Sequence, residues 1–305
     1  MTWSRREALI AAGLAGVGLT VSGCRLLNSP SLPALAPSAS SAAASRSPVA
    51  AAFEERYNVR LITRALNEDR RLINPGPNGE NLVIDWDDER IHVLDETLRL
   101  LPEAFYRGRA DRRSGEPLYV HLGLLRQVDR ARGFSIAAEM RPYFSTDPVV
   151  IFLINSFPVN ARGRAYSRSV IVHELTHKVS NLERRDSYEA LFRPTGMRTQ
   201  ADLNRVYASI LTRDRSGQPT FESASAYGAF NLEEHGAVAS EHYFLGREVF
   251  FYGLKPNAVP ELGALGEMGY YGYARFLGEE QTAIFYDALK ANLYEGREYR
   301  YQRLL

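Results

Sequence analysis

The chain has 305 residues, a formal net charge of +1 and one cysteine. The near-neutral charge and the absence of a basic stripe in the sequence argue against nucleic acid as a partner. No internal repeat is visible, and residues 53–305 have a length typical of a single domain.

The N-terminal residues have the layout of an export signal. The charged stretch "SRREAL" precedes an apolar run over residues 8–21, which is too short to span a bilayer comfortably as a mature helix. The paired arginines resemble a twin-arginine signal, a route that exports folded proteins, and "VSGC" resembles a lipobox ending in Cys24. We therefore expect residues 1–23 to be a signal peptide. A lipid on Cys24 would then anchor the protein in the bacterial cell envelope, on the periplasmic or outer-surface side.

Residues 24–52 have the composition of a flexible tether. Ser, Ala and Pro dominate this stretch, and neither a helical nor a strand period is visible. If Cys24 carries the lipid, the mature chain has no thiol left for a disulfide, for metal ligation or for nucleophilic catalysis. Any catalysis must then come from His, Asp, Glu, Ser, Tyr or Lys side chains.

Residues 53–305 predict an α+β domain that is mostly helical. The stretch "DDERIHVLDETLRLLPEAFYRG", residues 87–108, has apolar residues at helical spacing after an acidic start, which predicts a helix. Strands are predicted in "PLYVHLG", "GFSIAAEM" and "PVVIFLI", because these runs are β-branched or apolar and are bounded by Gly or Pro. The run Val149–Ile154 is apolar throughout, so we expect neighbours on both of its faces.

The next stretch, "SRSVIVHELTHKVSN", contains the motif H-E-x-x-H within a helix predicted over residues 165–180. His173 and His177 are four residues apart, so their imidazoles can reach one metal ion from the same helix face. Glu174 lies about 100° further around the helix, where it can take a proton from the attacking water and pass it to a leaving amine. Lys178 follows directly, and we expect it to point to solvent.

A catalytic zinc site needs a third protein ligand. No histidine follows at the short metzincin spacing H-E-x-x-H-x-x-G-x-x-H. The stretch "SAYGAFNLEEHGAVASEHYFLG", residues 225–246, predicts a second helix able to pack on the first, and a helix that donates one carboxylate to an H-E-x-x-H pair is the gluzincin layout. Its possible ligands are Glu233, Glu234, His235, Glu241 and His242.

Part of this stretch, "YGAFNLEEHGA", resembles the catalytic domain of anthrax lethal factor and its relatives. That family has the pattern Y-G-x-x-N-x-x-E-x-x-A downstream of its H-E-x-x-H helix. The residues that fit it in register are Tyr227, Gly228, Asn231, Glu234 and Ala237. The resemblance implies a zincin-like metallopeptidase domain over residues 53–305, with a small sheet packed on the H-E-x-x-H helix. It also implies one Zn²⁺ per chain, Glu234 as the third ligand and Tyr227 as the group that stabilises the oxyanion.

The sequence departs from the family pattern after the ligand glutamate. The family has two aromatic residues and a later acid there, whereas this chain has His235, Gly236 and Val238. Glu241 or His235 could therefore orient a ligand, and Glu241 is the alternative third ligand.

These residues together predict a zinc-dependent peptidase that acts on a peptide or protein substrate in the cell envelope or outside it. Two alternatives stay open: a hydrolase or amidase acting on cell-wall peptide, and a non-catalytic lipoprotein that binds a partner and uses His235 as a fourth metal ligand. The strand at Val149–Ile154 could pair with an extended substrate. The tyrosines at 270, 271 and 273 could line a cleft or serve packing alone.

Overall fold

The computed structural model describes residues 47–70, 82–106, 117–124, 138–141, 149–153, 157, 159–182, 195–197, 199–208, 211–213, 219–221, 228, 232–263, 265–266 and 270–301. The predicted signal peptide and residues 24–46 of the predicted tether, with Cys24, lie outside these residues, as does Tyr227. Residues 48–52, the predicted end of the flexible tether, are instead the first part of the helix Pro48–Tyr57, so the tether prediction was wrong there. The described part is mostly helical with small sheets, which confirms the α+β class. Each of its helices is too short or too polar to cross a bilayer.

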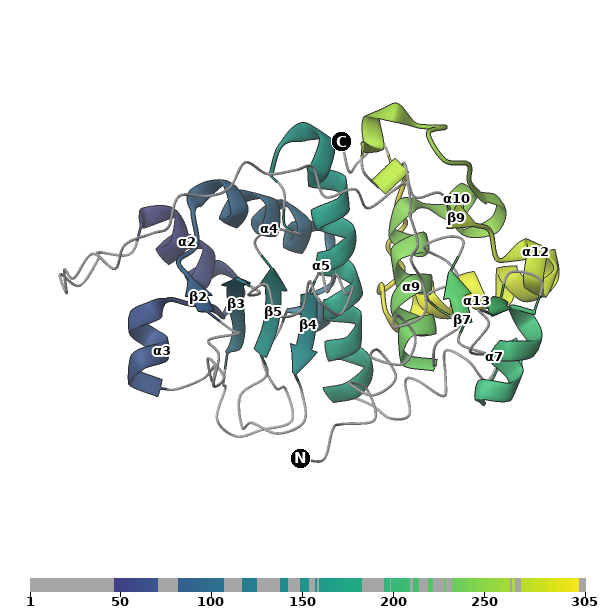
Figure 1. The fold of residues 1–305 in the computed structure, drawn as a ribbon, viewed down its shortest axis with the longest axis horizontal. Coiled ribbons are helices and arrows are strands. Elements are labelled where there is room, and N and C mark those ends of the chain that lie inside the picture. Colours follow the sequence, from purple (N-terminus) through teal and green to yellow (C-terminus); the bar gives the residue numbers. More distant parts are fainter. Residues whose placement is uncertain are drawn as a thin grey trace.

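The largest sheet occupies the N-terminal half (Figure 1). Its strands are β1 (Val59–Ile62), β2 (Leu82–Ile84), β3 (Leu118–Leu124), β4 (Ala138–Arg141) and β5 (Val149–Leu153). The order is β1-β3-β5-β4, with β2 also paired to β3. The strand β3 is parallel to β1 and β5, and β4 is antiparallel to β5.

The three strands predicted before the motif helix are confirmed as β3, β4 and β5, but their order corrects one expectation. The strand β5 lies between β3 and β4, with Val150 paired to Val120 on one side and to Met140 on the other. Because β5 already has a strand on both sides, it is not the strand that pairs with an extended substrate. Among the described strands, β4 is the outer one at this end of the sheet.

Helices pack beside this sheet. They include α2 (Pro48–Tyr57), α3 (Arg64–Arg70) and α4 (Asp88–Leu100), and α4 leads into the 3-10 turn η1 (Glu103–Phe105). The Asp87 side chain accepts a hydrogen bond from the Arg90 amide and so caps α4. The predicted helix is confirmed from Asp88 to Leu100. The apolar residues predicted to face inward are buried from Ile91 in α4 to Phe105 in η1.

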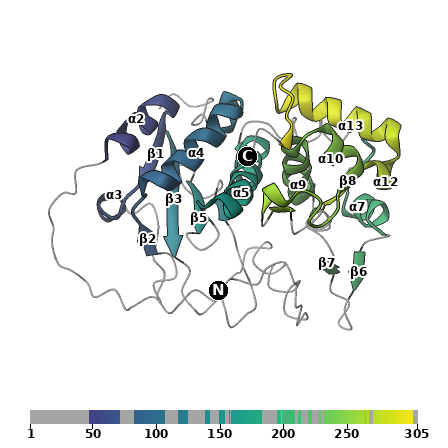
Figure 2. The ribbon, with the colours of Figure 1, turned by 90° about the horizontal axis from the view of Figure 1, so that it is seen from above.

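The motif helix α5 (Ala161–Leu182) stands in the middle of the molecule. It contacts β4, α4 and η1 on one side and α9 on the other, and it separates the sheet from the C-terminal helices in Figures 1 and 2. Ile171, Val172 and Leu175 are almost completely buried. A helix that is apolar on several sides suits this central position.

The C-terminal half is helical around an aromatic core. Its helices are α7 (Gln200–Val206), α9 (Leu232–Leu245), α10 (Arg247–Tyr252), α12 (Ala274–Leu277) and α13 (Glu279–Asn292), with a 3-10 turn η5 (Pro260–Leu262). Two short antiparallel pairs accompany them, β6 (Leu211–Arg213) with β7 (Pro219–Phe221) and β8 (Gly253–Leu254) with β9 (Tyr270–Tyr271). The rings of Tyr243 and Tyr294 stack with centroids 4.4 Å apart. Tyr270 and Tyr273 are 4% and 1% exposed, so both pack in this core.

The C-terminal segment ties the two halves together. The Arg297 guanidinium donates to the carbonyl oxygens of Leu100 and Leu101 at 3.1 and 2.8 Å, and the Tyr299 hydroxyl donates to Leu100 at 2.7 Å. The last carbonyls of a helix lack partners within the helix. Arg297 and Tyr299 supply these missing hydrogen-bond partners at the end of α4.

Lys178 does not point to solvent, and that expectation was wrong. Its side chain is completely buried, and its ammonium donates to the Ala104 carbonyl at 2.6 Å. Lys178 lies on the side of α5 that packs against η1, and this packing shields its side chain from solvent. The hydrogen bond joins the motif helix to the turn after α4.

We expect Lys178→Ala to lower the free energy of unfolding by about 2 to 4 kcal/mol, because it leaves a cavity and a carbonyl without its donor. Urea denaturation measures this change. Lys290→Ala is the control, since Lys290 pairs with Glu298 at the surface and its loss should cost less than about 1 kcal/mol. Equal effects of the two substitutions would contradict the anchoring role of Lys178.

Candidate metal centre

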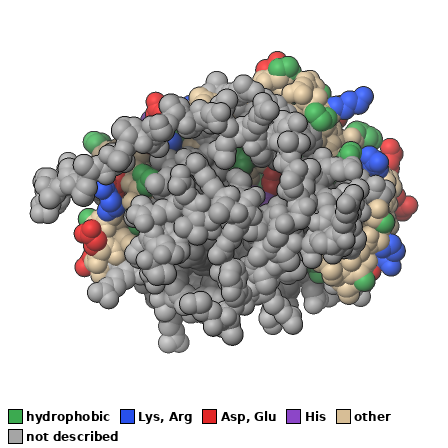
Figure 3. All heavy atoms as spheres, viewed as in Figure 1, with side chains coloured by type: hydrophobic (Ala, Val, Ile, Leu, Met, Phe, Trp, Pro, Cys, Tyr) green, Lys and Arg blue, Asp and Glu red, His purple; other side chains and the backbone are tan. Residues whose placement is uncertain are grey.

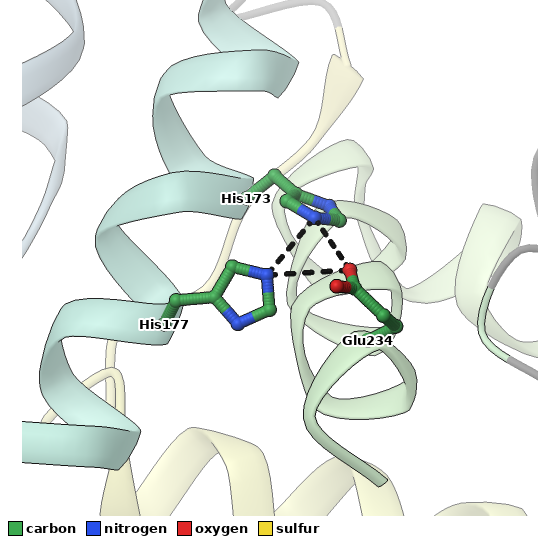
Figure 4. Close-up of side chains that lie close together, drawn as sticks. All are labelled: His173, His177 and Glu234. Atoms are coloured by element: carbon green, nitrogen blue, oxygen red, sulfur yellow. Dashed lines mark hydrogen bonds and ion pairs between the residues drawn. The ribbon is translucent and has the colours of Figure 1, made fainter. Parts of the chain in front are cut away.

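The structure brings His173, His177 and Glu234 together between α5 and α9 (Figure 4). The Nε2 atoms of the two histidines are 3.2 Å apart. The Glu234 Oε2 atom lies 3.1 Å from Nε2 of His173 and 3.3 Å from Nε2 of His177. These three atoms form a nearly equilateral triangle to which each residue contributes one atom.

This triangle fits a zinc ion. Nitrogen and oxygen ligands bind zinc at about 2.0 to 2.2 Å in tetrahedral geometry, so neighbouring ligand atoms lie roughly 3.3 to 3.5 Å apart. The observed separations are 3.1 to 3.3 Å, close to this spacing. Two imidazoles and one carboxylate are also a donor set found in catalytic zinc sites. The three side chains could therefore hold the ion with little movement.

Glu241 holds the other nitrogen of His173. Its Oε1 atom lies 2.5 Å from His173 Nδ1, and its Oε2 accepts a hydrogen bond from Ser169 Oγ at 2.7 Å. An ionised carboxylate only accepts, so Nδ1 of His173 carries a proton, and Nε2 is the nitrogen that would bind a metal once it gives up any proton of its own. Of the two carboxylates that the sequence left open, Glu234 is in the triangle and Glu241 lies against Nδ1 of His173.

The charges in the site stabilise one another when no metal is bound. Burial alone would lower the pKa of His173, but hydrogen bonds to Glu234 and Glu241 outweigh it and raise that pKa well above its usual value. Burial would raise the pKa of Glu234, yet the neighbouring rings of His177 and His173 bring it well below the usual value. Both shifts favour a charged imidazole beside a charged carboxylate, and a metal ion would replace the proton on Nε2 of His173.

Glu174 is next to His173 on α5 but is not one of the three clustered residues. Glu174 is only 6% exposed, so its carboxylate is largely shielded from water. Its role as a base that flanks a metal without ligating it stays a prediction. Tyr227, the predicted oxyanion donor, lies outside the described residues.

The two histidines of α9, His235 and His242, face the aromatic core. His235 Nδ1 is 2.8 Å from the Tyr207 hydroxyl, and its ring stacks on Phe285 with centroids 5.5 Å apart. The His242 ring contacts Tyr270 at 4.9 Å. Burial lowers the pKa of each imidazole to about 3, so both are neutral. His235 therefore serves neither as the group that orients His173 nor as a member of the metal cluster.

The sequence reasoning missed Ser169. This serine is one helical turn before His173 on α5, so the four-residue spacing that relates His173 to His177 also relates Ser169 to His173. That spacing was the available signal. A serine so placed faces the same neighbouring helix as the two histidines.

The site is enclosed but can be reached from outside. The His173 and Glu241 side chains are 12% and 15% exposed. Figure 3 shows an acidic side chain and a histidine visible near the middle of the face drawn.

Comparison with protein-family models, curated proteins and solved structures gave no match for this chain. The resemblance to lethal factor therefore depends on the two motifs. The structure places the first on α5 and, of the second, Glu234 and Ala237 on α9, while Tyr227 and Asn231 lie outside the described residues.

We expect zinc affinity to fall as the pH falls. Zinc must displace the proton on Nε2 of His173. Below the raised pKa of His173 the zinc affinity should therefore drop about tenfold for each unit by which the pH falls. The same raised pKa stabilises the metal-free fold at pH values below the usual histidine pKa, and this contribution is lost as the pH rises through the raised pKa. Zinc titrations between about pH 6 and about pH 8 would measure the slope, and a flat profile would contradict the proton assignment.

Proposed function

We propose that this chain is a zinc-dependent peptidase with a zincin-like domain of the lethal factor type. One zinc ion per chain would be held by His173, His177 and Glu234. The observation that carries the proposal is the triangle of Nε2, Nε2 and Oε2 atoms with sides of 3.1 to 3.3 Å. Three protein ligands are the number that catalytic zinc sites use, because the fourth position is kept for water or substrate.

A bound zinc would supply Lewis-acid polarisation of a water molecule and of the scissile carbonyl. Glu174 would take the proton of the attacking water and deliver it to the leaving amine. The burial of Glu174 favours this role, because a carboxylate shielded from bulk water exchanges its proton with groups inside the site. Tyr227 would donate a hydrogen bond to the oxyanion, as the resemblance implies.

The outer strand β4 suits an extended peptide substrate. It is antiparallel to β5 and contacts α5, the helix that carries both histidines. Among the described strands no further strand pairs with it on its other side, so its backbone groups there could hydrogen-bond a substrate chain by strand addition. The strand thus takes the role that the sequence had suggested for β5.

The proposed location is the bacterial cell envelope. The twin-arginine signal would export the folded protein, and a lipid on Cys24 would anchor it on the periplasmic or outer-surface side. Folding before export would complete the α5–α9 site before the protein leaves the cytoplasm. Cell-wall peptide is accordingly the alternative substrate, since the same chemistry would hydrolyse its amide bonds.

A structural zinc is disfavoured because the expected fourth ligand is used elsewhere. His235, the suspected residue, bonds the Tyr207 hydroxyl and stacks on Phe285. Glu241 is held by His173 and Ser169. Among the described residues, the metal cluster therefore has three members, one fewer than closed structural sites have.

We expect Glu234→Ala to abolish stoichiometric zinc binding, because it removes one of three ligands. Glu241→Ala should keep one zinc per chain at saturation but bind it about 10- to 100-fold more weakly. Metal analysis of the purified protein and competition with a chelator measure both quantities. Loss of stoichiometric zinc only in Glu241→Ala would reverse the two assignments.

We expect Glu174→Gln to retain zinc and to lose about 10²- to 10⁴-fold in peptide hydrolysis, the usual contribution of a general base. Unfolded protein and purified cell wall, assayed in parallel, would separate the two substrate classes. Glu233→Gln is the matched control, since Glu233 is exposed on α9 beside the ligand. Full activity of Glu174→Gln would contradict the mechanism, and absence of hydrolysis by a zinc-loaded wild type on both substrates would favour a non-catalytic role.

A further inference from the structure

Ser169 is a buried residue of α5 whose hydroxyl meets a carboxylate of α9. It is 4% exposed, and its Oγ donates to Glu241 Oε2 at 2.7 Å. A serine hydroxyl has one proton to donate. That proton is therefore committed to Glu241.

Glu241 bridges two positions on the same helix. One of its oxygens is bonded to Ser169, and the other lies 2.5 Å from Nδ1 of His173, one turn further along α5. A carboxylate held by both oxygens cannot rotate about its last bond without losing a hydrogen bond. Ser169 thereby fixes the orientation in which Glu241 receives the His173 proton.

A second hydroxyl of α5 shows what Ser169 could otherwise do. Thr176 donates to the Val172 carbonyl one turn back at 2.7 Å, and it also contacts Ser240 on α9 at 2.7 Å. Bonding to the preceding turn is the common use of a helical Ser or Thr hydroxyl. Ser169 instead bonds across the interface to the carboxylate that holds a proposed ligand.

The surroundings limit the contact of this pair with water. Tyr270 is buried and lies close enough to Ser169 and Glu241 for both to affect the pKa of its phenol. Burial, and then the charge of Glu241, raise the pKa of this phenol well above its usual value, so it stays neutral. In such a shielded place a charge-assisted hydrogen bond is stronger than it would be in water.

We propose that Ser169 is a positioning residue for the metal, acting through Glu241 on the orientation and tautomer of His173. This inference depends on the proposed zinc site and adds a residue outside its ligand set. Residues that hold a metal-bound histidine typically contribute 10- to 100-fold to metal affinity. Ser169 is one step further out, so its contribution should reach at most the lower part of that range.

The test is a double-substitution cycle on zinc affinity in the full-length protein. Zinc dissociation constants are measured by chelator competition at one pH for wild type, Ser169→Ala, Glu241→Ala and the double variant. We expect Ser169→Ala to weaken binding about tenfold. The double variant should bind no more weakly than Glu241→Ala alone, because Ser169 has nothing to position once the carboxylate is gone.

Thr176→Val is the matched control. It removes a buried hydroxyl from the same helix interface, and that hydroxyl is bonded to Ser240 and Val172 rather than to Glu241. It should lower the stability of the metal-free protein in urea while leaving the zinc dissociation constant unchanged. A general loosening of the interface would instead weaken zinc binding in both Ser169→Ala and Thr176→Val.

The possible failures can be told apart. Unchanged zinc affinity in Ser169→Ala, or an equal loss with and without Glu241, would overturn this inference and leave the proposed site standing. Weaker binding in Thr176→Val would overturn it as well. A wild type that binds no zinc would overturn the proposed function together with the inference.

Discussion

The packing of α5 against α9 is the constraint on which the site depends. Two otherwise apolar helices meet here through polar side chains, and a buried polar group is costly unless it has a partner. On α9, Glu234 contacts both histidines of α5, and Glu241 bonds to His173 and Ser169. Thr176 and Ser240 complete the interface. The sheet and α4 support α5 from one side, while the aromatic core supports α9 from the other, so the distance between the two helices is fixed by both halves of the molecule.

The same two carboxylates explain how the site can be built before a metal arrives. Two imidazoles alone at 3.2 Å would not hold each other in place. Glu234 contacts both rings, and Glu241 bonds the far side of His173. In the metal-free protein the charges raise the pKa of His173 and lower that of Glu234, so a proton balances the carboxylates. In the proposed site a divalent cation would take the place of that proton, and the ligand atoms already lie near the spacing that it needs.

Local periodicity was enough to predict the elements that carry the site, but not their pairing. The helix spacing predicted α5, α9 and the triad His173, Glu174 and His177, because residues four apart share a face. Glu234 and Glu241 are seven apart and so also share a face. The register of the resemblance favoured Glu234, and the contacts with Nε2 and Nδ1 of His173 place Glu234 in the triangle and Glu241 on the other side of that ring. Lys178 was misplaced for a similar reason: its environment is set by η1, a segment more than seventy residues earlier. The interior position of β5 likewise follows from long-range strand pairing that an apolar run does not encode.

The number of ligands is what separates a catalytic from a structural interpretation. A closed zinc site takes four protein ligands, and a catalytic one takes three. Of the remaining candidates on α9, Glu233 is exposed and is not a member of the metal cluster. The other three each have another partner: Glu241 is bonded to His173, His235 to Tyr207, and His242 packs on Tyr270. Recruiting any of them as a fourth ligand would break a buried contact, which is costly. Within the part of the chain that the structure describes, the catalytic arrangement is therefore the one that needs no side chain to leave its present partner.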